Sequence, residues 1–357
     1  MTVYINGRFL TQPMTGVERY AYNICKALAD MGQPFTLVCP KAKFCSEYDV
    51  SNFRIVRFGF GNSHFWEQCV LPFFFVGKRN YIVLSLMGLG SIAIRNKVMT
   101  IHDLAFIKNP AWYSHAYGLY YRLMTPLAVK TSHHIITVSE FSKHEILKFY
   151  PFLGESDISV VYTALDDKFL HQPTFSDEPT ERYALAVSSI DPRKNFARLL
   201  SAYKDISGIH LYIVGNYNRV FSKQEGLQIE GNNVQFLGRV SDDQLLDLYC
   251  HASCFIFPSI YEGFGLPPLE AMACGCPVLT SDIPVQHEVC GDAALYFNPF
   301  EPDNIRSVIQ QYLSTTDILR KKMRESGYNN ITRFSFEKSA QRLVEILGRY
   351  MNTTNKK

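Results

Sequence analysis

The sequence lacks the segments that mark exported and membrane-spanning proteins. Its N-terminus has no basic region followed by an apolar stretch, so we expect no secretory signal. The longest markedly apolar run, residues 69–76 (CVLPFFFV), contains a proline and is far shorter than the roughly 18–20 residues that cross a bilayer. The nine cysteines form no CxxC pair, and we expect buried free thiols in a reducing cytoplasm, without disulfides and without a metal site.

Two other features are missing, and each argues against a class of function. No GxGxxG follows the first expected strand, which disfavours an enzyme that uses a nicotinamide or flavin cofactor. A strong basic excess is also absent, because 36 Lys and Arg against 33 Asp and Glu give a net charge of +3. Nucleic-acid binding is therefore not expected.

The small net charge is unevenly distributed along the chain. Residues 1–172 hold 17 Lys and Arg against 12 Asp and Glu, whereas the remainder holds 19 against 21. Chance scatter is one interpretation of this asymmetry. The other is a first half that faces an anionic partner, such as a membrane surface or a phosphorylated acceptor.

The length of 357 residues predicts about two domains, and 47% hydrophobic with 19% charged residues is typical of globular proteins. Helical periodicity is clear at 16–31 and again in a final helix at 336–351. Short apolar segments indicate strands at 3–6, 35–39, 81–86, 98–101, 135–138 and 158–162, then at 183–187, 211–214, 234–237, 254–257 and 278–280. This alternation predicts an α/β protein with two doubly wound parallel sheets, joined at residues 171–182, which are rich in Pro, Thr and acids.

The densest chemical pattern is residues 259–270, SIYEGFGLPPLE, which run from a strand into a helix. Gly263 and Gly265 let the backbone approach a ligand closely, and the two prolines suit a first helical turn. Glu262 and Glu270 could accept hydrogen bonds from hydroxyls on opposite parts of one ligand. The alternative is an ordinary loop with one acid placed favourably in the helix dipole.

A second pattern, SIDPRKN at 189–195, follows the strand expected at 183–187. Asp191 can cap a helix, and Pro192 fits its first position. Arg193 and Lys194 are then expected in the first turn, where cations oppose the helix dipole. That cost is understandable if an anion docks at the helix N-terminus, although a solvated surface pair is the alternative.

Two weaker signals lie in the first half. His102, in IHDL, follows the strand expected at 98–101, at the end of a parallel sheet where ligands bind. It could donate to a hydroxyl or stabilise developing charge, or it could be purely structural. Gly16 opens the first helix, whose N-terminus can face phosphate.

Together these segments resemble the retaining glycosyltransferases of family 4, which have the GT-B fold. Residues 262–270 look like the family's E-x7-E motif, within the nearly continuous match FPSIYEGFGLPPLEAMACGCPV. The segments TGVERY, IHDLAF, IITVSEFS, DPRKN and FLGRVSDDQLLDLY extend the resemblance over almost the whole chain. It implies an acceptor-side Rossmann-like domain at 1–172, a nucleotide-sugar domain at 173–335, and a helix at 336–357 that returns to the first domain.

The resemblance also implies roles for individual residues. Glu270 would bind the ribose, Glu262 and His102 the donor sugar, and Lys194 with Arg193 the diphosphate. The further donor-binding residues that it implies are Gly16, Arg239, Val240, Gly263, Phe264, Gly265 and Leu266. In one departure, Ser189 stands where many relatives have an arginine, and we expect Arg193 to supply that charge.

The implied reaction is same-face attack of an acceptor hydroxyl on the anomeric carbon, with no cofactor besides the donor. The chain has no Asp-x-Asp cluster at a strand end, which is consistent with a metal-independent enzyme. The resemblance favours GDP-mannose as donor. A UDP-hexose or another GDP-sugar, a nucleotide-sugar epimerase of related fold, and a non-catalytic binding protein are the alternatives.

The expected acceptor is a lipid-linked oligosaccharide of O-antigen or capsule at the inner membrane face. A cytoplasmic, peripherally membrane-bound enzyme would suit the basic first half. The Phe-rich residues 73–75 either contact the membrane or are buried.

Overall fold

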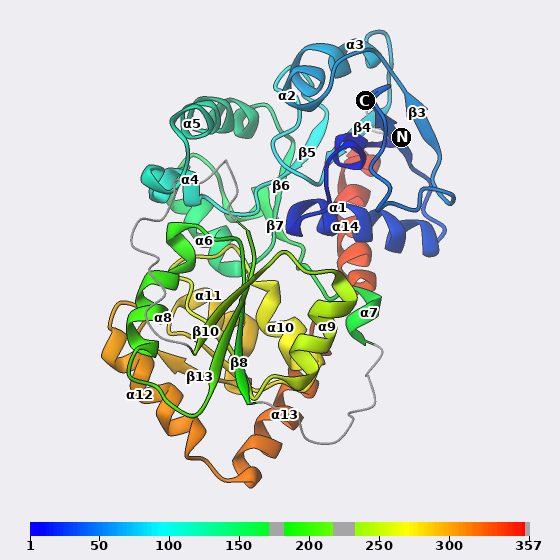
Figure 1. Cartoon of the computed structure of the whole chain (residues 1–357). Helices are drawn as coiled ribbons and strands as arrows, with labels where there is room; N and C mark the ends of the chain where they lie inside the picture. The colour runs from blue at the N-terminus through cyan, green and yellow to red at the C-terminus, as the bar shows by residue number, and fades with distance from the viewer. Residues whose placement is uncertain (171–181, 217–232, 354–357) are drawn as a thin grey trace. The chain divides into compact units, whose positions relative to one another are not determined.

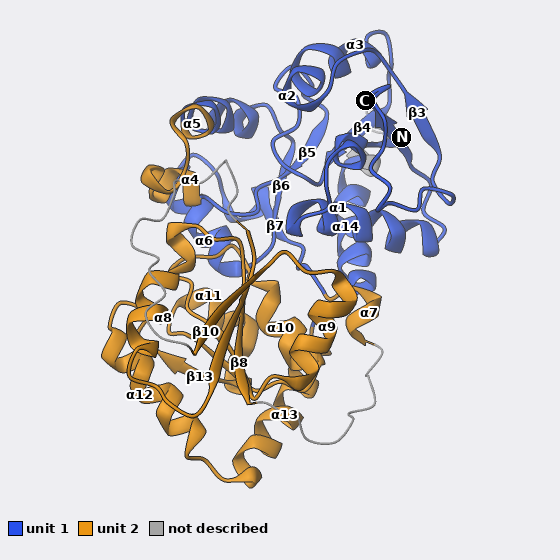
Figure 2. Ribbon diagram, in the orientation of Figure 1, with its two compact units in different colours: residues 1–104, 119–164, 334–357 blue, residues 105–118, 165–333 orange. Residues whose placement is uncertain are grey.

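The computed structural model describes residues 1–170, 182–216 and 233–353 (Figure 1). The chain divides into two compact units (Figure 2). Unit 1 comprises residues 1–104, 119–164 and 334–357, and unit 2 comprises 105–118 and 165–333. The join expected at 171–182 lies, except for its last residue, outside the described residues.

Unit 1 is built on a seven-stranded sheet in the order β3-β2-β1-β4-β5-β6-β7, with every neighbouring pair parallel. The strands are β1 (Thr2–Asn6), β2 (Thr36–Cys39), β3 (Ile55–Arg57), β4 (Tyr81–Ser85), β5 (Lys97–Thr100), β6 (His134–Thr137) and β7 (Ile158–Val160). The six strands expected here are confirmed. The sequence did not predict β3, because this three-residue edge strand is only partly buried and has no apolar run.

Unit 2 contains a six-stranded parallel sheet in the order β10-β9-β8-β11-β12-β13. Its strands are β8 (Tyr183–Val187), β9 (His210–Val214), β10 (Val234–Gly238), β11 (Cys254–Phe257), β12 (Val278–Ser281) and β13 (Ala294–Phe297). The five expected strands are confirmed. The sequence did not predict β13, because its four residues are mostly half-buried and show neither an alternating pattern nor a long apolar run. Two doubly wound parallel sheets are therefore present, as predicted.

Helices cover the sheet of unit 1. α1 begins at Gly16, and the Glu18 carboxylate accepts from the backbone N–H of Thr15 at 3.3 Å, which closes a capping box. α14 packs against α1, and Ser339 Oγ donates to the Tyr162 carbonyl at 2.7 Å, so the final helix returns to unit 1 as expected. The helical segments are η1 (Gly7–Thr11), α1 (Gly16–Asp30), α2 (Ser63–Phe65), the π-helical η2 (Trp66–Val70), α3 (Leu71–Phe74), α5 (His115–Lys130, in unit 1 from Leu119), α6 (Glu140–Phe149), η4 (Glu155–Asp157) and α14 (Phe336–Thr353).

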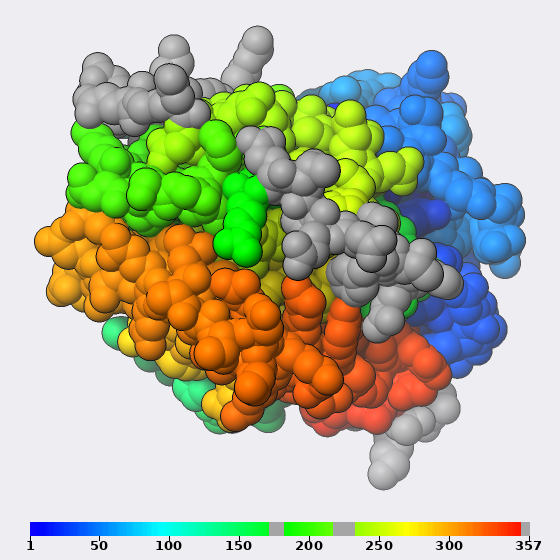
Figure 3. Space-filling model, turned by 60° about the horizontal axis from the view of Figure 1, so that its bottom comes forward, coloured from blue at the N-terminus to red at the C-terminus, as the bar shows by residue number. Residues whose placement is uncertain are grey.

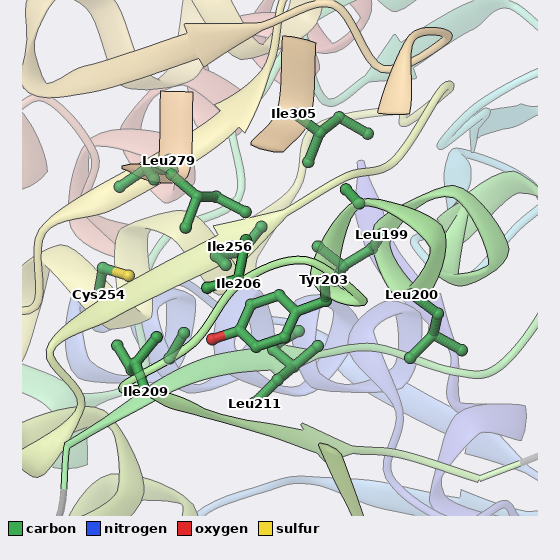
Figure 4. Close-up of a cluster of buried hydrophobic side chains, with 14 of the residues drawn as sticks. Leu199, Leu200, Tyr203, Ile206, Ile209, Leu211, Cys254, Ile256, Leu279 and Ile305 are labelled. Atoms are coloured by element: carbon green, nitrogen blue, oxygen red, sulfur yellow. The ribbon is translucent and has the colours of Figure 1, made fainter. Parts of the chain in front are cut away.

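The core of unit 2 lies between its sheet and the helices α8 and α12. Figure 4 shows part of this core, with Leu199, Leu200, Tyr203, Ile206, Ile209, Leu211, Cys254, Ile256, Leu279 and Ile305. Helices α12 and α13 form the surface drawn in orange in Figure 3. The helical segments are α4 (Ala105–Lys108), η3 (Pro110–Trp112), α7 (Asp167–Leu170), η5 (Pro192–Lys194), α8 (Phe196–Tyr203), α9 (Asp242–His251), α10 (Leu266–Ala273), α11 (Pro284–Cys290), η6 (Gly291–Ala293), α12 (Pro302–Leu313) and α13 (Asp317–Ile331).

The strand order places the functional candidates of unit 2 together. The sheet reverses direction of winding at β8, whose neighbours are β9 and β11. In such sheets ligands bind outside the carboxyl ends of the strands at this reversal. The segments that leave β8 and β11 are the two that carry the densest sequence patterns, so they emerge side by side at the expected ligand position.

Candidate functional site

Three loops of unit 2 are tied together at the carboxyl end of its sheet. The backbone N–H of Ile260 donates to the Arg193 carbonyl at 2.8 Å. Asn195 is buried in a left-handed conformation (φ 61°), and its Nδ2 donates to the carbonyls of Pro258 and Pro299 at 3.0 and 2.7 Å. These bonds fix the segment after β8 against the segment after β11. No role was predicted for Asn195, although an Asn before a helical run is a signal for such a conformation.

The segment after β8 differs from the expected helix start. Asp191 does cap: its Oδ1 accepts from the Arg193 N–H at 3.2 Å, and its Oδ2 accepts from Ser189 Oγ at 2.8 Å. However, Arg193 and Lys194 form a single 3₁₀ turn, η5, and the left-handed Asn195 separates it from α8. Both cations therefore lie in a helical turn after the Asp191 cap, as predicted, but this turn is 3₁₀ and does not continue into α8. Their side chains face buried carboxylates.

Two cations and two carboxylates form the centre of the site. Lys194 Nζ lies 2.5 Å from Glu262 Oε1, and Arg193 Nη1 lies 4.0 Å from Glu262 Oε2. Arg193 Nε is 3.5 Å from Asp191 Oδ1, so its guanidinium lies between both acids. The Lys194 and Glu262 side chains are only 11% and 7% exposed, which excludes the alternative of a solvated surface pair.

The two acids respond differently to burial. Burial raises the pKa of Glu262, but the charges of Lys194 and Arg193 and the hydrogen bond from Lys194 outweigh it, so the pKa is lowered overall. Burial also raises the pKa of Asp191, and there the same two cations do not reverse the effect. Glu262 is thus the carboxylate that the cluster keeps ionised.

Glu270 lies one to two turns into α10, as predicted, and it is oriented by a residue that sequence reasoning missed. The hydroxyl of Tyr249, on α9, donates to Glu270 Oε2 at 2.9 Å. Tyr249 is buried, and burial together with the adjacent Glu270 charge raises its pKa well above the usual range, so the phenol remains a donor. Tyr249 is the last residue of the segment FLGRVSDDQLLDLY, but the sequence suggested no role for it, because it reads as one apolar position of helix 242–251.

The glycine loop before α10 has one strict conformational requirement. Gly265 has φ 95°, and a Cβ there would lie 2.6 Å from Gln286 Nε2. Leu266 begins α10 and the prolines follow it in the first turn, as predicted. Phe264 is buried, with its carbonyl 3.4 Å from Gln286 Nε2. The approach of a ligand to the backbone of Gly263 remains a prediction.

Other expected donor-binding residues lie farther along the sheet. Arg239 and Val240 follow β10, the edge strand two places from β8, in the turn before α9. Arg239 is exposed and Val240 is half-buried. Their contact with a base stays a prediction.

The two expected site residues of unit 1 lie at different elements. His102 follows β5, and its Nε2 lies 2.9 Å from the Leu86 carbonyl, to which it donates. The ring meets Tyr20 edge-on at 5.1 Å, and burial lowers the His102 pKa. The neutral ring then presents Nδ1 as an acceptor. Gly16 is the first residue of α1, and a Cβ there would touch nothing within 4 Å.

Sequence reasoning missed a buried ion pair at the carboxyl end of β1. Asn6 Nδ2 donates to Glu67 Oε1 at 2.6 Å, and Arg8 Nε lies 3.5 Å from the same oxygen. His64 Nδ1 lies 3.7 Å from Glu67 Oε2. Burial raises the pKa of Glu67, but the charges of Arg8 and His64 and the hydrogen bonds from His64 and Asn6 lower it overall. The available signal was that Glu67 is the only acid between residues 50 and 102.

The remaining expectations have mixed outcomes. All nine cysteines are free, but only six are buried, since Cys69 is exposed and Cys45 and Cys250 are half-buried. Phe73 is exposed and Phe75 is buried, so neither interpretation of residues 73–75 holds for the whole segment. In the described part of the chain, no cluster of three His, Cys, Asp or Glu side chains could hold a metal. None of the described helices combines the length and apolarity that crossing a membrane requires.

Comparison with known proteins identifies relatives over most of the chain. The family model described as Glycosyltransferase Family 4 matches residues 14–169, and that of Glycosyl transferases group 1 matches 168–330. The chain is 34% identical over 256 residues to O-antigen chain mannosyltransferase RfbU of Salmonella typhimurium, covering 70% of this chain and 68% of the relative. It is 29% identical over 262 residues to O-antigen chain mannosyltransferase B of Escherichia coli, covering 68% of each. The structure of Anabaena HepE in complex with UDP-glucose matches with a TM-score of 0.73 at 17% identity, covering 98% of this chain and 99% of that one.

Proposed function

The chain belongs to glycosyltransferase family 4, and on that premise we propose that it moves mannose from GDP-mannose to a hydroxyl of a growing surface polysaccharide, with retained anomeric configuration. Its two doubly wound units are those of the GT-B fold. Two relatives named as O-antigen mannosyltransferases support mannose as the transferred sugar. A UDP-sugar is the second candidate donor, because a structure of the same fold is described with UDP-glucose.

The observation that carries the proposal is the buried pair of Lys194 and Glu262. In a nucleotide-sugar, a hydroxyl-rich sugar ring is bonded directly to a diphosphate. The Lys194 ammonium and Arg193 guanidinium are the natural partners of the diphosphate. When Lys194 and Arg193 pair with the diphosphate, the ionised Glu262 carboxylate becomes available to accept a hydrogen bond from a sugar hydroxyl.

The same groups account for catalysis. As the bond between anomeric carbon and phosphate oxygen breaks, negative charge grows on the leaving diphosphate. Lys194 and Arg193, held in place before reaction by Glu262 and Asp191, stabilise that charge more than they stabilise the ground state. The acceptor hydroxyl attacks from the face that the diphosphate leaves, and its proton passes to the departing diphosphate oxygen. Glu262 has no nucleophilic role in this scheme.

The outer donor contacts are proposed as the family resemblance implies them. Glu270, oriented by Tyr249, accepts from the ribose hydroxyls. The backbone of 263–266 approaches the sugar and diphosphate, and Arg239 with Val240 contacts the base. His102 accepts a sugar hydroxyl on Nδ1, since its Nε2 proton is already donated to the Leu86 carbonyl.

We further propose a lipid-linked oligosaccharide as acceptor and a peripheral position at the inner membrane face. The basic bias of residues 1–172 supports this assignment. The donor requires no additional cofactor in this scheme, because charge stabilisation is assigned to side chains.

Nucleotide release from a panel of GDP- and UDP-sugars, with and without glycan acceptors, tests the proposal. Acceptor-dependent GDP release from GDP-mannose, with an α-linked product detected by NMR, is the expected result. Donor consumption without an acceptor would indicate an epimerase or hydrolase instead. Binding without turnover would indicate a non-catalytic protein.

A further inference from the structure

Two thiols meet where helix α9 ends beside helix α10. Cys250 is the next-to-last residue of α9, and Cys274 directly follows α10. The two helices are in contact, and Figure 1 shows them side by side. The Cys274 thiol donates a hydrogen bond to the Cys250 sulfur, so the two sulfurs face each other across this contact.

Contacts on both sides of the two thiols hold them together. On one side, the Tyr249 hydroxyl donates to Glu270 Oε2 at 2.9 Å. On the other side, Cys276 Sγ donates to the Ala252 carbonyl at 3.7 Å. The three contacts follow one another in the same order along both segments, so tertiary packing fixes the thiols against each other.

The two thiols differ in the way that disulfide chemistry requires. Cys250 is half-buried, and the hydrogen bond from Cys274 lowers its pKa overall, although burial and the Asp247 charge raise it. Cys274 is buried, and the same hydrogen bond, together with burial, raises its pKa. The shared proton therefore stays on Cys274, and Cys250 is the sulfur that becomes a thiolate and can be reached from solvent.

A simpler role for a cysteine in a protein core is that of a small apolar side chain. That role fits Cys254 and Cys290, which are buried and whose pKa values burial raises. It does not account for Cys250. An accessible thiol of lowered pKa, placed next to a second thiol, is the arrangement found in cysteines that sense oxidants.

We propose that Cys250 and Cys274 form a site of reversible oxidation, at which hydrogen peroxide joins the two thiols as a disulfide. The Cys250 thiolate attacks one peroxide oxygen, which forms an S–O bond, breaks the O–O bond and releases hydroxide. This hydroxide takes up the proton that Cys250 had lost. The Cys274 sulfur then attacks the Cys250 sulfur, which forms the S–S bond and breaks the S–O bond, and the Cys274 proton leaves with the departing hydroxide as water. Two thiols lose two electrons, and one peroxide is reduced to two waters.

The disulfide also affects the proposed donor site. Tyr249 precedes Cys250 in α9, and Glu270 lies one helical turn before Cys274. A disulfide holds its sulfurs about 2 Å apart, closer than two hydrogen-bonded thiols, so α9 and α10 shift relative to each other when it forms. The hydrogen bond that orients Glu270 shifts with them. This consequence deepens the proposed function and rests on it, because it requires Glu270 to bind the ribose.

Peroxide treatment of the full chain tests the proposal. After treatment, the free thiols are alkylated and the protein is digested after glutamate. Glu262 and Glu270 lie between the two cysteines, whereas residues 240–306 contain no Lys or Arg at which trypsin could separate them. We expect mass spectrometry to find the fragments with Cys250 and Cys274 joined, and dithiothreitol to separate them.

Two variants show whether the joined fragments come from this pair of thiols. Cys250→Ser should not form them. Cys69→Ser removes an exposed thiol of unit 1 and is the matched control, which should form them like the wild type. Wild-type protein without the joined fragments would overturn the proposal, and so would a bond from Cys250 to Cys276 in place of Cys274.

Steady-state kinetics with GDP-mannose measures the effect on the donor. Oxidation of the wild type should raise KM for the donor about fivefold or more, the low end of the coupling between linked sites. Cys250→Ser should keep its KM in peroxide. An unchanged KM in the oxidised wild type would overturn the link to Glu270. Absence of turnover in the reduced wild type would count against the proposed function instead, whereas the fragment analysis judges the thiols alone.

Discussion

Lys194 and Glu262 are 68 positions apart in the chain, and their side chains meet at 2.5 Å in a buried ion pair. The pair forms because β8 and β11 are neighbours and the segments that follow them are bonded through Ile260 and Asn195. Removing one partner leaves the other as a buried charge that prefers a new counter-ion. We therefore assign to this pair the binding of an anion and of a hydroxyl, as proposed above.

Lys194→Met is expected to lower kcat for transfer by about 10²–10³-fold, the usual cost of removing one group that stabilises developing negative charge. Steady-state kinetics with GDP-mannose measures the change. Lys143→Met is the control, because Lys143 pairs with the exposed Glu155 on unit 1. A kcat within a fewfold of the wild type for folded Lys194→Met would remove Lys194 from the chemistry.

Tyr249→Phe removes the hydrogen bond that orients Glu270. The ribose lies away from the reacting bond. Losing the hydrogen bond that orients Glu270 should therefore weaken donor binding equally in the ground state and in the transition state. We expect KM for the donor to rise several-fold with kcat almost unchanged. A fall in kcat at constant KM would show instead that Glu270 acts on the reacting centre.

Glu67→Ala should destabilise the protein by about 3–5 kcal/mol, because it leaves Arg8 as an uncompensated buried charge. Denaturant unfolding followed by circular dichroism measures the loss. Glu155→Ala, which breaks an exposed pair, should leave the unfolding midpoint at the wild-type value. Equal midpoints for the two variants would mean that the Arg8–Glu67 pair contributes little.

His134 makes the stability depend on pH. Burial lowers its pKa to about 4 in the folded protein, below the ordinary value of about 6.5. Between these values the unfolded chain binds more protons, so the free energy of unfolding should fall by up to about 3 kcal/mol as pH drops from 6.5 to 4. His134→Gln should flatten this slope in urea titrations at each pH. An unchanged slope would assign the acid sensitivity to other groups, such as His102, whose pKa burial also lowers.

The sequence predicted the sheets well because buried parallel strands are short, fully apolar segments bounded by turn residues, as in β8 and β11. It singled out Lys194 and Glu262, which the structure brings together, because each follows a strand within a recognisable pattern. It could not place Arg193 and Lys194 in a 3₁₀ turn, since the left-handed Asn195 that ends the turn is stabilised by carbonyls from two other loops. Sequence-based prediction missed Tyr249 and the Arg8–Glu67 pair for the same reason, because tertiary packing decides which partners these residues contact.

Turnover of GDP-mannose by a folded Glu262→Ala protein tests the central claim most directly. Circular dichroism and thermal unfolding establish that the variant is folded, and Glu262→Gln provides a variant of nearly equal volume. The account predicts a loss of transfer of about 10²-fold or more, because the donor sugar loses its carboxylate and Lys194 loses the group that positions it. Near-normal turnover by the folded Glu262→Ala protein would contradict the account.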